Sequence, residues 1–345
     1  MQFSNGPLVH NVAEPRTPGL ISYFSSWGPS NDLFFQPTFV APGNNVLSTY
    51  PLTSGGLAVL GGTSGSTPFT AGAAALVWNA RSSQNLDSVQ VRNLLSVTTE
   101  KVPAALNTPS TYISLALQGS GNINVTRATQ AAGIPSVGHF ALNDTEYFQG
   151  TQTFDIYNSG PDQLVYTFRH TPAQTIATFA APGDITVAPE PPVLSGVTAG
   201  VTTPRSVIIP SGETRTVTFT FTHPSVSADV ASQYPIYSGW IDLIATSRNA
   251  RTNLQSELPE LELRTEADAA CAVPYMGMAN RMFDASVLDT STLIYGIPLP
   301  LVYNNAVDEI QYGPATYTFA TRGPQAFFRL ARVSPRSSCH LHRWN

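Results

Sequence analysis

The chain has 345 residues, of which 42% are hydrophobic and only 11% are charged. Average soluble domains contain about 25% charged residues, and the abundance of threonine, serine, proline and glycine favours a β-rich, turn-rich architecture over a helical bundle. The length predicts two or three domains of about 150 residues each. The formal charge is −5, and no basic stripe is interleaved with aromatic residues, which excludes nucleic acid as an expected partner.

Cysteines and apolar runs in the sequence indicate whether disulfides, a membrane span or a signal peptide are expected. Cys271 and Cys339 are too few for a disulfide framework, so a single bridge and two unrelated thiols both stay open. No run approaches the roughly 18 consecutive apolar residues of a membrane-spanning helix, so no membrane span is expected. Residues 1–7 lack the charged and apolar regions of a signal peptide, and we expect any export signal to lie upstream of Met1.

The first third reads as α/β material. Residues 1–20 are polar and proline-containing, typical of a loop that enters a domain midway, and short apolar strands with tight turns are expected over residues 21–29 and 39–43. Residues 69–78 are apolar nearly all round, which predicts a helix buried on every side.

Two further helices are expected. Asp87 or Ser88 can cap the first, which then places Val91, Leu94 and Leu95 on one face. The second covers residues 125–132, because glycine and then proline follow it as stop signals.

Period-two alternation takes over after about residue 136. Residues 153–157, 164–168 and 216–222 alternate apolar and polar side chains, and turn signals separate them, which is typical of an antiparallel sandwich. The predicted inward-facing side chains are Phe154, Ile156, Val217, Phe219 and Phe221. Residues 278–345 mix strand-like pieces, at 292–295 and 316–319, with loops, and no fold is assigned to them.

The sharpest chemical signal is Gly62-Thr-Ser-Gly-Ser-Thr-Pro68, directly ahead of the predicted buried helix. Unsatisfied N–H groups and the positive dipole end at a helix N-terminus stabilise an oxyanion that forms beside them. Pro68 suits the first turn, where a backbone N–H has no intrahelical use. Taken alone, the same residues are also compatible with ordinary helix capping.

Five motifs in register resemble the subtilisin-like (subtilase) family. They are Phe24-Ser-Ser-Trp-Gly-Pro29, Ala41-Pro-Gly43, Ser48-Thr49, Gly62-Thr-Ser-Gly-Ser-Thr-Pro68 and Ala71-Gly-Ala-Ala-Ala-Leu76. The resemblance implies a serine endopeptidase that acts on a peptide or protein substrate. It implies Ser64 as the acylating nucleophile, activated by a histidine that an aspartate orients, and no cofactor or metal is expected.

The two partner residues precede the serine in the chain order of subtilisin. Upstream of Ser64 the only histidine is His10, and the only acids are Glu14 and Asp32. His10 lacks the family's His-Gly-Thr surroundings and is expected to be a surface residue, while Asp32 belongs to a turn. No upstream asparagine is assigned to the oxyanion hole. We therefore expect the triad to be incomplete and the isolated chain to be practically inactive.

Two further expectations follow from the resemblance. Most relatives have methionine and a small residue after the serine, whereas Gly65 and Ser66 stand here, which is expected to loosen the hold on Ser64. Without earlier strands of a parallel sheet, Leu76, Val77 and Trp78 are expected to be partly exposed.

Residues of about 138–277 resemble the fibronectin type III-like sandwich that follows the catalytic domain in large cell-envelope and fungal secreted subtilases. The motifs that carry this resemblance are Gln149-Gly-Thr-Gln-Thr-Phe-Asp-Ile-Tyr-Asn158, Val165-Tyr-Thr-Phe-Arg-His170, Tyr237-Ser-Gly-Trp-Ile241 and Val273-Pro-Tyr-Met-Gly277. His170 and His223 are then strand residues and not metal ligands. Two glycosylation patterns, at Asn124 and Asn143, are consistent with an extracellular or cell wall-associated location.

The predicted fold is thus part of a subtilisin-like α/β parallel-sheet domain (1–135), an all-β fibronectin type III-like sandwich (136–277) and an unassigned segment (278–345). Two hypotheses stay open. The first is a subtilisin-like endopeptidase represented from its middle onward. The second is a non-catalytic binding or spacer module in which Ser64 is a relic. Substrate specificity, calcium dependence and oligomeric state are not predicted.

Overall fold

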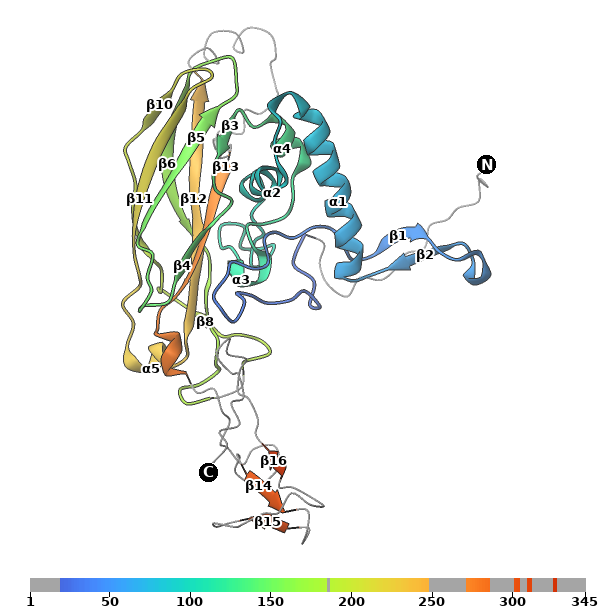
Figure 1. Cartoon of the computed structure of the whole chain (residues 1–345), viewed down its shortest axis with the longest axis vertical. Helices are drawn as coiled ribbons and strands as arrows, with labels where there is room; N and C mark the ends of the chain where they lie inside the picture. The colour runs from blue at the N-terminus through green and yellow to red at the C-terminus, as the bar shows by residue number, and fades with distance from the viewer. Residues whose placement is uncertain are drawn as a thin grey trace, which may run out of the picture.

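A β-sandwich with helices against one side makes up most of the structure, a computed structural model (Figure 1). It describes residues 19–184, 187–247 and 271–285, together with the backbone of three short strands, β14 (Leu301–Asn304), β15 (Glu309–Gln311) and β16 (Gln325–Phe327). His10, Glu14, Cys339 and the strand-like pieces expected at 292–295 and 316–319 lie outside the described residues.

The N-terminal part of the described chain combines a hairpin with four helices. Strands β1 (Val46–Thr49) and β2 (Leu57–Leu60) pair in antiparallel fashion. The α-helices are α1 (Thr63–Ala80), α2 (Ser88–Val97), α3 (Leu115–Gln118) and α4 (Val125–Gln130), and two 3-10 turns are η1 (Leu52–Ser54) and η2 (Ser82–Gln84).

The strands expected over residues 21–29 and 39–43 are not formed. Residues 21–29 run through turns and bends, and Val40 makes only a single parallel bridge, to Asn122. A strand needs a continuous ladder of backbone hydrogen bonds with one partner segment. Within residues 39–43 only Val40 forms a β-bridge, and Gly43 bonds to a different segment, at Gly62. Within the described residues 19–132 this bridge is the only parallel pairing of backbone segments, so the expected parallel strands are reduced there to a single bridge.

Helix α2 has the predicted cap and buried face. The Asp87 carboxylate accepts the Gln90 N–H, and the Gln90 side chain accepts the Asp87 N–H, at 2.8 Å each. This reciprocal pair satisfies two donors that a helix start leaves without partners. The predicted face, Val91, Leu94 and Leu95, is buried as expected. The helix predicted over residues 125–132 is α4, which ends two residues earlier, at Gln130.

Helix α1 is buried on one side only, so the prediction of burial all round is wrong. Ala73 and Val77 are its buried residues, whereas Leu76 and Trp78 are 61% and 47% exposed. The exposure expected for Leu76 and Trp78 is confirmed, and that expected for Val77 is wrong. The reason is spacing: residues four apart share a face of a helix, and the face of Ala73 and Val77 lies against α2 and α4.

The sandwich has two sheets. One has the strand order β10-β6-β12-β13-β4, with β7 on β12 and β8 on β7, and the other has the order β3-β5-β11-β9. Their bounds are β3 (Gly133–Pro135), β4 (Phe140–Asn143), β5 (Thr151–Asn158), β6 (Leu164–Pro172), β7 (Thr175–Ala177), β8 (Val193–Leu194), β9 (Gly200–Thr202), β10 (Val207–Ile209), β11 (Thr214–Thr222), β12 (Pro235–Ser247) and β13 (Cys271–Met278). Helix α5 (Ala228–Ala231) and the turn η3 (Met282–Asp284) flank β12 and β13.

Aromatic side chains fill the space between the two sheets. Phe140 lies within 5.6 Å, 6.5 Å and 5.9 Å of Phe154, Phe219 and Phe221, measured between ring centroids. The inward-facing set predicted from the alternation, Phe154 and Ile156 on β5 and three residues of β11, is buried. The sandwich and the facing of these strands are therefore confirmed, and its strand pairs are antiparallel except that of β4 with β13, which is parallel.

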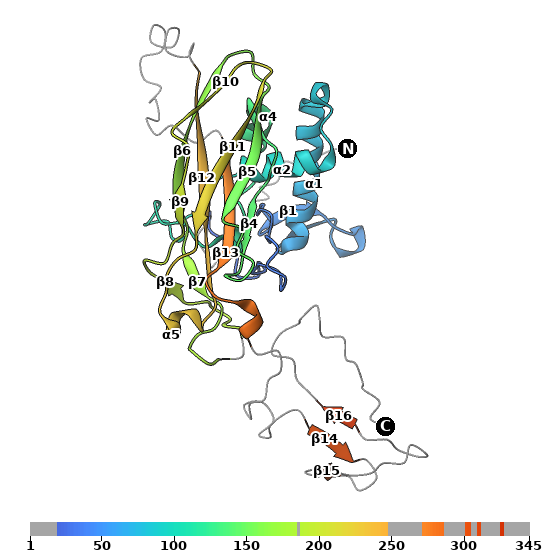
Figure 2. The ribbon, with the colours of Figure 1, turned by 60° about the vertical axis from the view of Figure 1, so that its left-hand side comes forward.

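One hydrophobic core runs from the helices into the sandwich. It includes Val77 of α1, Leu94 of α2 and Ala128 of α4 together with Phe140 and Val273 of the sandwich. Helix α2 contacts β3 and β13 on one side and α1 on the other, and Figure 2 shows it between the sandwich and α1. The helical layer and the sandwich are thus parts of one packed body.

Truncation of Phe219 tests the sandwich core. We expect Phe219→Ala to lower the free energy of unfolding by about 3–5 kcal/mol, because the substitution leaves a cavity between the sheets. Thr220→Ala, at the exposed neighbouring position, should cost less than about 1 kcal/mol. Urea unfolding of both variants measures the difference, and equal losses would contradict this packing.

Candidate functional site

Ser64 lies in the first turn of α1, in a segment that we call the serine turn (residues 61–66). It is the second residue of the helix and its side chain is exposed. Gly62 precedes the helix with φ 147° and ψ 163°, a conformation that glycine adopts readily and that side-chain-bearing residues avoid. The sharp entry into α1 thus keeps Ser64 at the surface, at the mouth of the helix.

Three hydrogen bonds hold the serine turn. The Gly62 N–H donates to the Gly43 carbonyl at 2.8 Å, and the Gly65 N–H donates to the Gly62 carbonyl at 2.9 Å. The Ser66 hydroxyl donates to the Ala41 carbonyl, also at 2.9 Å. The segment Ala41-Pro-Gly43 is therefore the support on which the start of α1 rests.

Close packing explains two of the glycines. A Cβ on Gly43 would lie 2.1 Å from Ser66 Oγ and 2.8 Å from the Gly62 carbonyl oxygen, and a Cβ on Gly65 would lie 3.2 Å from the Gly43 carbonyl oxygen. Gly65 therefore lets the helix approach its support, and Ser66 bonds to it. These contacts oppose the loosening expected from the Gly65-Ser66 pair.

The electrostatic field at Ser64 favours an anion. The first N–H groups of a helix have no carbonyl four residues earlier to accept their hydrogen bonds, and the helix dipole places positive charge there. The first turn of α1 carries no acidic residue, and no side chain caps it. Its positive end therefore stays available to a negatively charged group next to Ser64.

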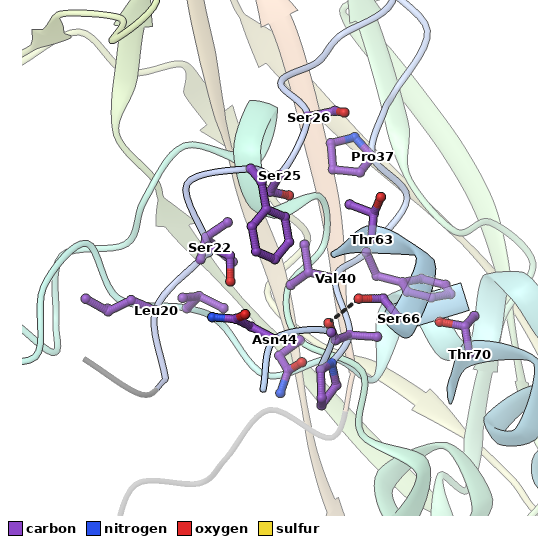
Figure 3. A pocket seen from close by; sticks show the side chains of 18 of the residues that line it. Leu20, Ser22, Ser25, Ser26, Pro37, Val40, Asn44, Thr63, Ser66 and Thr70 are labelled. Carbon is purple, nitrogen blue, oxygen red and sulfur yellow. Dashed lines mark hydrogen bonds between the residues drawn. The ribbon is translucent and has the colours of Figure 1, made fainter. Parts of the chain in front are cut away.

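A cavity of about 690 Å³ borders the serine turn on another face of the helix. Thr63, Ser66 and Thr70 project from α1 toward it, and Leu20, Ser22 and Ser25 face them across the space (Figure 3). Ser64 is not among its lining residues. The cavity is lined by hydroxyl, amide and apolar groups and lies directly beneath the turn that exposes Ser64.

The structure brings no predicted triad partner to Ser64 within the described residues. Asp32 is exposed in a turn, as expected. His139 stacks on Phe35, His170 bonds to the Tyr275 hydroxyl at 2.6 Å, and His223 contacts Phe148, and none of these partners belongs to the serine turn. Burial lowers the pKa of His139 and of His170 below its ordinary value, so both imidazoles are stabilised in their neutral form.

Sequence reasoning missed two contributors to the site. It singled out Ala41-Pro-Gly43 as a matching motif without assigning it contact with the serine turn, and it treated Ser66 only as a departure. The signal that could have found the contact is the glycine itself, because a glycine in a motif often marks close backbone approach. The hairpin formed by β1 and β2 was also not predicted, although Gly55-Gly56 between two short apolar runs is a signal for one.

Comparison with known protein families adds the identification. A family model described as the subtilase family matches residues 9–121, and one described as an Fn3-like domain matches residues 140–259. The resemblance of residues 9–121 to the subtilase family is therefore confirmed. In the described structure this subtilase region includes the hairpin, α1, α2 and α3, and the Fn3-like region follows as most of the sandwich.

The curated relatives include a subtilisin and a larger proteinase. Subtilisin Savinase from Lederbergia lenta is 40% identical over 107 residues, which cover 31% of this chain and 32% of that protein. The PI-type proteinase from Lactococcus lactis subsp. cremoris is 24% identical over 321 residues, which cover 85% of this chain and 15% of that protein. The chain thus spans about a third of the length of the subtilisin and less of the larger proteinase.

Two glycine substitutions test the support of the serine turn. Gly43→Ala should lower the unfolding temperature, because its Cβ would displace Ser66 and press on Gly62. Gly72→Ala, in the middle of α1 where an added Cβ meets nothing within 4 Å, should stabilise the protein by up to about 1 kcal/mol. Thermal unfolding measures both, and a Gly43→Ala protein as stable as the unsubstituted chain would contradict the contact.

Proposed function

We propose that this chain supplies the nucleophile, Ser64, of a subtilisin-like serine endopeptidase. The observation that carries the proposal is the exposed hydroxyl of Ser64 in the first turn of α1, at a helix end that no acidic residue neutralises. The subtilase match over residues 9–121 supports the same assignment.

The proposed chemistry is acyl transfer. Ser64 Oγ attacks the carbonyl carbon of a peptide bond while a histidine takes its proton, and the histidine then protonates the leaving amine. Water attacks the resulting ester, which releases the second product and restores the serine. The negative oxygen of each tetrahedral intermediate lies next to the Ser64 N–H, where the positive end of α1 stabilises it.

The general base and the acid that orients it are assigned to polypeptide outside the printed sequence. The subtilisin chain order places both before the serine, and residues 19–63 contain no histidine. The partial coverage of the relatives is compatible with this assignment. In subtilisin, loss of the histidine alone lowers turnover by about a millionfold, so the chain by itself should hydrolyse peptides at a far lower rate than the complete enzyme.

The proposed setting is extracellular or cell wall-associated, with peptides or proteins as substrates. None of the helices within the described ranges is both long and apolar enough to cross a bilayer. The asparagines of the two glycosylation patterns, Asn124 and Asn143, are both partly exposed. Asn124 also caps α4, because its side chain accepts the Arg127 N–H at 2.8 Å.

Covalent labelling tests the proposal. The chain is expressed together with the coding sequence upstream of Met1 and treated with a fluorophosphonate, and the modified peptide is identified by mass spectrometry. We expect phosphonylation at Ser64 and hydrolysis of a casein substrate, and loss of both in Ser64→Ala. Ser83→Ala is the control, because Ser83 is an exposed serine beyond the other end of α1, and this variant should retain labelling at Ser64.

Other outcomes separate the two hypotheses. Labelling that persists in Ser64→Ala would contradict the assignment of the nucleophile. A folded, extended protein that neither labels at Ser64 nor hydrolyses casein would instead favour a binding or spacer module in which the serine is a relic. An upstream coding sequence without an aspartate and a histidine in that order would have the same meaning.

A further inference from the structure

An ion pair joins the subtilase region to the Fn3-like region in the interior of the protein. Lys101 is the one lysine in the sequence, and its Nζ lies 2.5 Å from Oδ1 of Asp242. The two side chains are 15% and 0% exposed. Charged groups are rarely buried without a specific partner, so separating the two regions here would leave both charges without their partner.

The surroundings of Asp242 make the pair asymmetric. Its other oxygen accepts two hydrogen bonds from the Arg169 guanidinium, at 3.1 Å and 3.0 Å, and one from the Thr171 hydroxyl, at 2.7 Å. Both of those donors belong to β6 of the sandwich itself. Among the partners of Asp242 only Lys101 belongs to the subtilase region, so this ion pair joins the regions, whereas Arg169 and Thr171 satisfy the carboxylate from within the sandwich.

Aromatic groups enclose the lysine. Lys101 Nζ lies 5.3 Å from the ring centroid of Trp240 and 5.7 Å from that of Tyr112, within the range of cation–π attraction. The indole N–H of Trp240 donates to the Ser120 carbonyl at 2.8 Å, which is a second bond between the regions. Burial lowers the pKa of Lys101, and Asp242 opposes that shift.

Backbone hydrogen bonds continue from Lys101 toward the serine turn. Its neighbour Glu100 exchanges two backbone hydrogen bonds with Asn122, at 2.8 Å and 2.7 Å. On either side of Asn122, the Gly121 carbonyl accepts the Val40 N–H and the Ile123 N–H donates to the Val40 carbonyl, at 2.9 Å each.

The last step leads from Val40 to Ser64. The residues that follow Val40 are Ala41 and Gly43, whose carbonyls accept the Ser66 hydroxyl and the Gly62 N–H. Val40 and Asn122 also line the cavity beneath the turn. The support of the serine turn is therefore attached, through two short backbone bridges, to the lysine that the sandwich holds.

We infer that Lys101 and Asp242 form a clamp through which the Fn3-like region positions the serine turn. In this role Lys101 is a positioning residue that acts through residues 38–43 and does not touch the substrate. The clamp goes beyond the spacer role considered above for the sandwich. Its meaning for catalysis rests on the proposed function, whereas its effect on the geometry of residues 61–66 does not.

Hydrogen–deuterium exchange of the full chain tests the clamp without any need for activity. In Lys101→Met, peptides covering residues 38–46 and 60–68 should exchange about tenfold faster than in the unsubstituted chain. The reason is that opening of these residues no longer has to break the ion pair, which lowers the free energy of opening. The variant should fold, since Arg169 and Thr171 still compensate Asp242. Lys101→Gln, which keeps a donor without the charge, makes the same comparison should the methionine variant fail to fold.

Arg169→Met is the matched control. It removes a cation from the same carboxylate but leaves the link between regions, so exchange at residues 60–68 should change by less than about twofold. Exchange in β11 serves as the internal reference and should be unchanged in both variants. The clamp is refuted by equal effects of the two substitutions, by acceleration confined to residues 99–103, or by the same acceleration in β11 as in the serine turn.

Discussion

The packing of α2 between α1 and the sandwich is the contact on which the rest of the structure depends. Val91, Leu94 and Leu95 are at most 3% exposed, and full burial of an aliphatic side chain contributes about 1.5–3 kcal/mol. The same helix reaches the sandwich through polar bonds, from Ser96 to the Gly138 carbonyl and from Asn93 to the Ser136 carbonyl. Its capping box fixes where this face begins.

This packing explains how the subtilase region keeps a defined site although much of α1 is exposed. Val77 is completely buried beside α2 and α4, while Leu76 and Trp78 face away. These exposed apolar side chains lie in the second half of α1, away from the serine turn at its start. The proposed enzyme therefore has two supports for its nucleophile in this chain: the helical layer held by the sandwich, and the Ala41-Pro-Gly43 segment beneath the turn.

The sequence predicted correctly those elements that depend on neighbouring residues alone, such as a helix cap or an alternating strand. Asp87 and Gln90 define a helix start whatever surrounds them. In β5 and β11 the alternation of apolar and polar residues allows only one face to be buried, the face that carries Phe154 and Phe219. The position of Ser64 at the start of α1 followed in the same way, from Gly62. Pro68, expected in the first turn, instead lies inside the helix, because α1 begins earlier than predicted, at Thr63. Its catalytic role was predicted from the family motifs and remains a proposal.

What the sequence could not reveal depends on contacts between distant residues. The apolar run in α1 says that burial is favourable, but which face is buried depends on where α2 and α4 lie. Lys101 and Asp242 are 141 positions apart, and nothing local to either residue indicates the other. The strands expected at 21–29 failed for a related reason, because apolar residues form a strand only where another backbone is available to pair with them.

Because one hydrophobic core runs through both, the subtilase region and the Fn3-like sandwich should fold as one cooperative body. Native-state hydrogen exchange in increasing urea measures it most directly, since it reports the opening free energy of α2 and of β12 separately. We expect the slowest-exchanging amides of both elements to converge on the same opening free energy. Amides of α2 that open at a markedly lower free energy than those of β12, at every urea concentration, would contradict it.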